Sequence, residues 1–233
     1  MASDPRWLAS VWPFVRAQLP PVPARVLEIG CGPLGGFVPA LLGGGYEVVG
    51  VDPEAPEAPA YQRIEFERYA PPRPLDCVVA STSLHHVADL DDVLDRVAAA
   101  LAANGKLVVV EWAWERFDQA TARWCFDRLP AATPATEPGW LQGHRDQWVA
   151  SGQPWDEFVR AWAEAEGLHA GREIMRGLDA RFDRQLHAAG PYFFADLDGV
   201  SEADEQGAID AGEIQATGIR YVGRRRGLTV ASS

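Results

Sequence analysis

The segment most diagnostic of this 233-residue chain is Val26-Leu27-Glu28-Ile29-Gly30-Cys31-Gly32-Pro33-Leu34-Gly35. It begins as a short apolar strand, continues as a glycine-rich turn and ends in the first residues of a helix. Glycine permits backbone conformations and close approaches that a side chain would block, and a helix N-terminus offers N–H groups to a ligand. The segment therefore predicts a turn that binds a cofactor between the first strand and the following helix.

A second apolar run follows this turn, from Glu47 to Val51, and it ends at Asp52. An acidic residue at the tip of the second strand is positioned to accept hydrogen bonds from the diol of a ribose. Pro53 begins a proline-rich loop that borders the same position. The two runs together predict a cofactor that contains a nucleoside.

The glycines alone leave two kinds of nucleoside cofactor open. Gly30, Gly32 and Gly35 satisfy the dinucleotide pattern G-x-G-x-x-G, so a nicotinamide-dependent oxidoreductase is one alternative. Glu28, however, brings a carboxylate that suits an ammonium or sulfonium group and repels a pyrophosphate. Pro33 has no N–H to offer a phosphate oxygen. These two residues favour S-adenosylmethionine (SAM).

The next segments alternate between strand and helix signals. They are a buried strand over Leu75–Ser81, the turn Leu84-His85-His86-Val87, a helix from Asp89 to Asn104 and a strand over Lys106–Trp112. Together with Glu28–Gly35 and Asp52, this array resembles the class I SAM-dependent methyltransferases, in particular their small-molecule, methyltransferase-11-like branch. The resemblance covers about residues 25 to 112. It departs from the family at Leu34, which fills the usual position of the third glycine.

The resemblance implies a cofactor, a product and a set of contacts. The cofactor is SAM and the product is S-adenosylhomocysteine (SAH). The residues predicted to bind the cofactor are Glu28, Gly30, Cys31, Gly32, Asp52, Pro53, Glu67 and Ser81. For Glu28 the alternative role is a structural hydrogen bond with the backbone of the turn, and for Ser81 the alternative is that it merely ends a strand.

Two adjacent histidines are the candidate catalytic residues. Histidine titrates near neutral pH, so His86, or less favourably His85, is suited to take a proton from an attacking hydroxyl or amine. The alternative is that one ring covers the cofactor while the other packs on the following helix. His144 and His187 are weaker candidates in the acceptor region. No histidines and cysteines cluster at zinc spacings, so we expect no metal site.

The rest of the chain predicts a single domain with an α/β, Rossmann-like, doubly wound sheet of seven strands, the last of them antiparallel, and an inserted helical cap. Within 1–233, residues 1–112 hold the N-terminal helix and the SAM-binding half, 113–178 the cap and acceptor region, and 179–233 the strands that complete the sheet. The remaining predicted elements are helices over Asp4–Leu19, Gly36–Leu42, Glu115–Leu129, Trp140–Ala150, Pro154–Glu166 and Ser201–Ala211, a loop over Pro130–Gly139, and strands over Ile64–Phe66, Asp179–His187 and Gly218–Arg224.

Composition narrows the partners. The 21 basic and 33 acidic residues give a net charge of −12, which argues against nucleic acid or an anionic membrane as the main partner. The sequence has no basic-then-apolar targeting segment and no apolar run long enough to span a bilayer, so we expect a cytoplasmic protein. The oligomeric state stays open.

The expected activity is methyl transfer to an oxygen, or less favourably a nitrogen, of a small, bulky, partly aromatic acceptor such as a secondary metabolite. The acceptor class is inferred from the His pair and from the aromatic residues of the cap. Two alternatives remain: a SAM-binding protein with a non-methylating role, such as a cyclase or regulatory partner, and the nicotinamide-dependent oxidoreductase. The aromatic residues of the cap are Trp140, Trp148, Trp155, Phe158 and Trp162.

Overall fold

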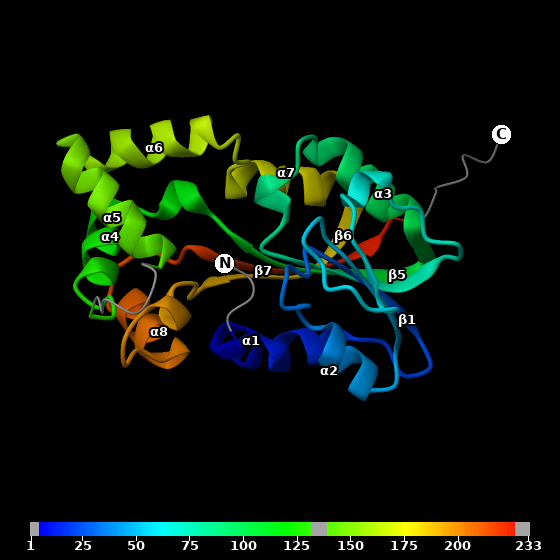
Figure 1. Cartoon of the computed structure of the whole chain (residues 1–233). Helices are drawn as coiled ribbons and strands as arrows, with labels where there is room; N and C mark the ends of the chain where they lie inside the picture. Colours follow the sequence, from blue (N-terminus) through cyan, green and yellow to red (C-terminus); the bar gives the residue numbers. More distant parts are fainter. Residues whose placement is uncertain (1–4, 132–138, 227–233) are drawn as a thin grey trace.

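A seven-stranded sheet forms the centre of the computed structural model, which describes residues 5–131 and 139–226 (Figure 1). The strand order is β3-β2-β1-β4-β5-β7-β6. The first five strands in this order pair in parallel, whereas β7 runs antiparallel between β5 and β6. The strands are β1 (Arg25–Ile29), β2 (Glu47–Val51), β3 (Tyr61–Gln62), β4 (Leu75–Ser81), β5 (Leu101–Trp112), β6 (Phe182–Gly190) and β7 (Gly218–Arg225). This arrangement confirms the predicted fold class.

Helices cover both faces of the sheet and gather at one end of it (Figure 1). One face carries α1 (Pro5–Gln18) and α2 (Val38–Gly43), and the other carries α3 (Leu90–Ala100) and α7 (Gly171–Arg181). At the end beyond β5 lie α4 (Gln119–Phe126), α5 (Trp140–Ser151), α6 (Trp155–Ala165) and α8 (Glu202–Asp210). In the described part of the chain, no helix is long and apolar enough to cross a membrane.

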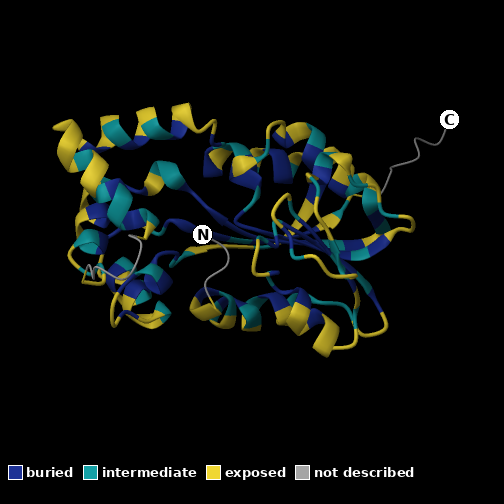
Figure 2. Cartoon of the chain, in the orientation of Figure 1, coloured by how far each residue is buried: buried dark blue, intermediate teal, exposed yellow. Residues whose placement is uncertain are grey.

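The strands divide the core into two clusters, one on each face (Figure 2). Successive side chains of a strand point to opposite faces, so Val108 and Val110 of β5 join the cluster under α1, while Leu107 and Val109 join the cluster under α3 and α7. Trp112, at the end of β5, extends the first cluster into the aromatic residues of α4 to α6. The core under the sheet is therefore continuous with the core of the helical end.

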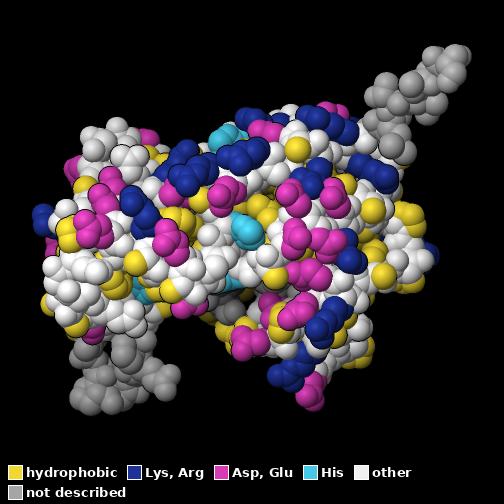
Figure 3. Space-filling view, turned by 90° about the horizontal axis from the view of Figure 1, so that it is seen from above, with side chains coloured by type: hydrophobic (Ala, Val, Ile, Leu, Met, Phe, Trp, Pro, Cys, Tyr) yellow, Lys and Arg dark blue, Asp and Glu magenta, His cyan; other side chains and the backbone are white. Residues whose placement is uncertain are grey.

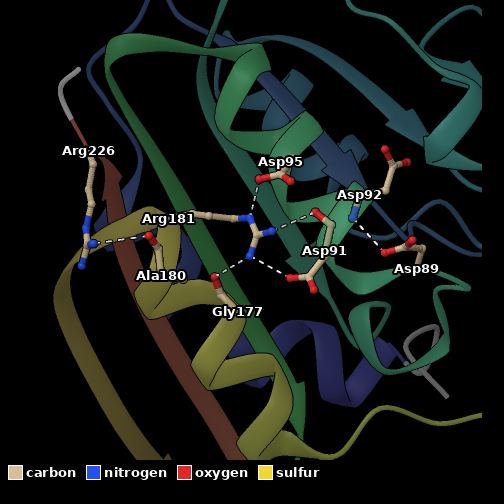
Figure 4. A network of polar contacts seen from close by, with 8 residues as sticks. All are labelled: Asp89, Asp91, Asp92, Asp95, Gly177, Ala180, Arg181 and Arg226. Atoms are coloured by element: carbon tan, nitrogen blue, oxygen red, sulfur yellow. Dashed lines mark hydrogen bonds and ion pairs between the residues drawn. The ribbon is translucent and has the colours of Figure 1, made fainter. Parts of the chain in front are cut away.

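Helices α3 and α7 are joined by one arginine (Figure 4). The Arg181 guanidinium contacts carboxylate oxygens of Asp91 at 2.9 Å and Asp95 at 2.6 Å, and it donates to the Gly177 carbonyl at 3.3 Å. A Cβ at Gly177 would lie 2.7 Å from Cδ1 of Leu94, so the two helices approach more closely there than a side chain allows.

Three predicted boundaries differ from the structure near β2, β5 and β6. The third strand is Tyr61–Gln62 rather than Ile64–Phe66, because side-chain-free Gly50 of β2 pairs with Tyr61. The predicted helix from Asp89 to Asn104 ends at Ala100, and the regular β4–β5 ladder starts only at Lys106. Residues 179 to 181, predicted as the start of a strand, end α7, whose buried Ile174 and Leu178 keep the helical period.

Other boundaries agree more closely. The predicted helix over Glu115–Leu129 is shortened to α4, because the Asp118 carboxylate caps its start by accepting from the Thr121 N–H at 2.8 Å. The helices predicted over Trp140–Ala150 and Pro154–Glu166 correspond to α5 and α6. Asp4 and most of the predicted loop over Pro130–Gly139 lie outside the described residues.

Candidate active site

The glycine turn after β1 is held between the ends of three strands. Gly30 and Gly32 have φ angles of 79° and 62°, which favour glycine. The Gly30 N–H donates to the Val51 carbonyl at 2.9 Å, and a Cβ at Gly30 would lie 2.3 Å from Cβ of Ser83. The turn therefore requires glycine for both its conformation and its close contact with the segment after β4.

Asp52 follows β2 and is held by two backbone N–H groups. Its Oδ2 accepts from Gly32 at 3.0 Å and its Oδ1 accepts from Glu54 at 2.7 Å. These bonds fix the carboxylate beside the glycine turn before any ligand arrives. Each carboxylate oxygen has a second lone pair, which remains available to a ribose diol.

A cavity of about 570 Å³ opens at this edge of the sheet. Its volume falls within the range of small-molecule sites. Six of the predicted site residues line it, namely Gly30, Gly32, Asp52, Pro53, Glu67 and His86, together with Thr82 and Ser83. Glu28, Cys31, Ser81 and His85 are not among the lining residues, and their predicted roles stay predictions. A second cavity, of about 580 Å³ between α1, α8 and β7, contains no predicted site residue.

Glu28 points away from the cavity, toward the start of α2. Both of its carboxylate oxygens accept from the Phe37 N–H, at 3.0 and 2.8 Å, and a Cβ at Gly36 would lie 2.3 Å from Oε1. Burial raises the pKa of Glu28 to about 8, opposed by these backbone bonds and aided by the charge of Asp52. The negative charge that the sequence argument assigned to Glu28 is therefore largely neutralised by a proton at pH 7, and the carboxyl holds the backbone of the turn.

Two other predicted residues are buried beside the cavity. Cys31 is fully buried, and desolvation, followed by the charges of Glu28 and Asp52, raises the pKa of its thiol to about 12. Ser81 ends β4 with a buried hydroxyl that has no partner among the described residues. Thr82 follows with a φ of 48°, which is unusual for a β-branched residue, and its buried hydroxyl also lacks a partner in this part of the chain.

His85 lies behind the cavity in the 3₁₀ turn η2 (Leu84–His86) and is paired with a carboxylate that the sequence analysis missed. Its Nδ1 is hydrogen-bonded to Glu111 of β5, and both residues are fully buried. The Glu111 carboxylate also accepts from the N–H groups of Leu84 and Trp112, each at 2.8 Å. Nε2 of His85 has no partner among residues 5–131 and 139–226. The available sequence signal was an acidic residue at the end of an apolar strand.

His86 lines the cavity, and its ring centroid lies 4.1 Å from that of His85. Desolvation, with a smaller effect of His85, lowers the pKa of His86 to about 4. The ring is therefore neutral at physiological pH, although the residue is exposed at the cavity. The two histidines thus have different surroundings: His85 faces a carboxylate, whereas His86 faces the cavity.

Aromatic rings pack around Trp112, directly after Glu111. Tyr192 stacks on Trp112 with centroids 5.6 Å apart and an angle of 9°, and Trp140 and Trp162 contact it at 5.6 and 6.0 Å. Nε1 of Trp112 is buried and lacks a partner within the described ranges. The segment that carries Tyr192 is fixed by buried Glu205, whose carboxylate accepts from the N–H groups of Tyr192, Phe193 and Phe194 at 2.8, 3.2 and 2.7 Å.

This combination of sheet order, glycine turn and strand-end aspartate is that of the class I methyltransferase fold. A family model described as "Methyltransferase domain" matches residues 6–148, which is more than half of the chain. The chain belongs to this family. It is a SAM-dependent methyltransferase, so the family match decides between the cofactors that the glycine pattern left open. The cavity and the carboxylate of Asp52 beside Gly32 fit this cofactor.

Three solved structures with the same fold have low sequence identity to this chain. A SAM-dependent methyltransferase from Mesorhizobium loti is 19% identical, with a TM-score of 0.54 and coverage of 93% of this chain and 98% of that one. Geranyl diphosphate C-methyltransferase from Streptomyces coelicolor A3(2), with SAH bound, is 16% identical, with a TM-score of 0.55 and coverage of 94% and 80%. The 1,6-didemethyltoxoflavin-N1-methyltransferase of Burkholderia thailandensis is 13% identical, with a TM-score of 0.51 and coverage of 97% and 79%. No curated protein matches the sequence.

Proposed function

We propose that this enzyme methylates an oxygen, or less favourably a nitrogen, of a small, bulky, partly aromatic molecule. The observation that carries the proposal is the buried pair of His85 and Glu111 beside the cofactor cavity. A hydroxyl must lose its proton as it attacks a methyl group, and a positioned base supports that step. Methylation of a carbon atom, the reaction named for the Streptomyces coelicolor enzyme, does not require removal of a hydroxyl proton.

Glu111 prepares His85 for this role. Its carboxylate is fixed by two backbone N–H groups and binds Nδ1, so Nε2 keeps the lone pair that accepts a proton. SAM, when bound, supplies an already activated methyl group. The work of the chain is therefore to orient the acceptor, exclude water and remove the proton. His85 is the base in this proposal, and His86 is a wall of the cofactor site.

The rings next to this pair support an aromatic acceptor. The ring of Trp112 contacts that of His85 edge-on, with centroids 6.0 Å apart. It also contacts the rings of Trp140, Trp162 and Tyr192. Such rings favour flat, apolar ligands. The chain has 21 basic and 33 acidic residues, and this acidic balance favours a small molecule over nucleic acid or an anionic membrane as partner. On the face seen in Figure 3, basic and acidic side chains lie close to one another.

The test is methyl transfer from isotopically labelled SAM to a panel of phenols, aliphatic alcohols, amines and carbon nucleophiles, with products identified by mass spectrometry. We expect methyl ethers of phenols as the main products. Glu111→Gln should reduce turnover with unchanged SAH affinity. Its matched control is Glu115→Gln, because Glu115 also accepts from two backbone N–H groups, at 2.8 Å each, without a histidine partner. Exclusive methylation of amines or carbon would overturn the proposal.

A further inference from the structure

His144 of α5 is a second buried histidine in the aromatic end of the molecule, and it lies outside the His85–Glu111 pair. Its ring is enclosed by Trp140, Phe158 and Trp162, with centroid distances of 5.5, 6.1 and 4.3 Å. Only 8% of the residue is exposed. Three aromatic neighbours offer the imidazole nitrogens no conventional hydrogen-bond acceptor.

One of the two ring nitrogens is nevertheless satisfied. His144 is hydrogen-bonded to the backbone of Trp140, one turn earlier in the same helix, while Nε2 has no partner in the described part of the chain. Nδ1–H is therefore the donor to the Trp140 carbonyl, and Nε2 is left as a lone-pair acceptor. Burial lowers the pKa of His144, opposed by the Trp140 bond and by the charge of Glu166, and this shift favours the neutral ring.

This acceptor belongs to the same group of rings as the proposed base. Trp140 and Trp162, which enclose His144, both contact Trp112, and Trp112 contacts His85. Nε1 of Trp112 is a buried donor without a partner in the same ranges. Buried polar atoms in folded proteins are almost always paired, so unpaired ones gathered in one cluster indicate groups that a ligand satisfies.

We propose that His144 determines acceptor specificity by accepting a hydrogen bond from an O–H or N–H group of the acceptor, at a position remote from the methylated atom. This inference rests on the proposed function and adds a chemical requirement to it. The acceptor is a flat ring system with a hydrogen-bond donor in addition to the group that is methylated. An analogue without that donor leaves Nε2 unpaired and is rejected.

His144 is suited to recognition rather than to proton removal. Unlike His85, it has no hydrogen-bonded carboxylate among residues 5–131 and 139–226 to stabilise an imidazolium, and aromatic rings surround it. His187, the other histidine with a lowered pKa in this half of the chain, is exposed on the edge strand β6, opposite Tyr221 of β7. His187 therefore supplies a matched control.

The test compares two probes of nearly identical shape, 5-fluoroindole, which has an N–H donor, and 5-fluorobenzofuran, which has none. Each is titrated into the full chain saturated with SAH, and binding is followed by fluorine NMR. We expect the wild type to bind 5-fluoroindole about two- to tenfold more tightly, the range of one neutral hydrogen bond. His144→Phe should remove this preference, and His187→Phe should keep it. His144→Gln, which restores an acceptor oxygen, should recover part of it.

Three results overturn the inference: equal affinity of both probes for the wild type, binding of neither, or a preference that survives His144→Phe. Unchanged SAH affinity verifies that each variant is folded, and the Gln variant provides the second measurement if Phe disturbs the helix. The labelled-SAM panel is read separately. O-methylation without a donor preference refutes only the role of His144, whereas a preference without O-methylation refutes only the proposed function.

Discussion

The two ends of the active site satisfy their polar groups in opposite ways. At the cofactor end, Glu28 and Asp52 are bound to backbone N–H groups, which fix the glycine turn in advance. At the cap end, Nε2 of His85, Nε2 of His144 and Nε1 of Trp112 have no partner among the described residues. The hydroxyls of Ser81 and Thr82, on the border between the ends, are also unpaired, as are Nε1 of Trp114 and the hydroxyls of Thr217 and Tyr221 elsewhere in the described chain.

The difference reflects two tasks: cofactor binding, which is common to the family, and acceptor binding, which is particular to each enzyme. A site for a cofactor shared by a whole family gains from carboxylates and glycines whose positions the backbone sets. A site for a particular acceptor gains from side chains whose hydrogen bonds only that acceptor completes, because an unpaired buried group penalises the wrong ligand. The predictions below test whether each residue belongs to the end to which its contacts assign it.

The largest effect is expected at His85. His85→Gln removes the proposed base, so kcat should fall by about 10²–10⁴-fold with the acceptor found in the panel. SAH affinity, measured by calorimetry, should change by less than about twofold, since His85 does not line the cavity. The companion variant His86→Gln alters a cavity wall. A larger fall in kcat for His86→Gln than for His85→Gln would assign the base to His86 instead.

Asp52→Ala should weaken SAH binding by about 10- to 100-fold, equivalent to roughly 1.4–2.7 kcal/mol. The variant removes the carboxylate that holds the Gly32 N–H and faces the cavity. Asp76→Ala is the control, because Asp76 also accepts a backbone N–H, from Arg25 at 2.8 Å, at the start of β1. Equal SAH affinity of the wild type and the Asp52 variant would remove Asp52 from the ribose role.

Glu28→Gln tests whether this residue acts only on the fold. Burial raises the pKa of the Glu28 carboxyl in the folded state to about 8, whereas its ordinary pKa, expected in an unfolded chain, is 4.5. The folded state thus binds more protons within this window, and its stability falls as the pH rises, by at most about 1.4 kcal/mol per pH unit.

Thermal unfolding is measured between pH 5 and 8 in steps of about one pH unit. The stability of Glu28→Gln should depend less on pH than that of the wild type. Exposed Glu164 supplies the control substitution Glu164→Gln, which should leave the dependence unchanged. A loss of SAH affinity of about tenfold or more in Glu28→Gln, with stability unaffected, would show that Glu28 contributes to cofactor binding.

The smallest effect, on the free energy of unfolding, is expected at the ion pairs of Arg181 that join α3 and α7. Arg181→Met removes contacts with Asp91 and Asp95, and we expect a loss of about 1 kcal/mol in the free energy of unfolding. Arg96→Met, which breaks an exposed pair with Asp92 within α3, should destabilise the fold less than Arg181→Met does. SAH affinity should stay the same in both variants. A changed affinity would mean that this joint influences the cofactor end.

Local signals explain which parts of this structure were predictable. The turn from Gly30 to Gly35, the aspartate after β2 and the strand from Gly218 each carry their own pattern of glycine, charge or alternation, and the fold class followed from their order. The two-residue strand β3 has no such pattern, because Tyr61 is placed by its contact with Gly50.

The candidate site was predictable only on its cofactor side. The pairing of His85 with Glu111 joins residues 26 positions apart through the β4–β5 register, and no local pattern reports it. Glu205 likewise acts on backbone groups 11 to 13 positions away. The unpaired nitrogens of Trp112 and His144 follow from packing, which depends on every neighbouring ring.

The position of β7 has a consequence for synthesis of the chain. This strand is the last of the described sequence, yet it lies between β5 and β6 and forms the antiparallel pairs of both. Until Gly218–Arg225 leaves the ribosome, β5 presents an unpaired edge along the apolar residues Leu107–Val110. Such an edge is prone to pair with other chains. We therefore expect the nascent chain to complete its sheet only once Gly218–Arg225 has left the ribosome, and chaperones that shield strand edges to raise the yield of folded enzyme.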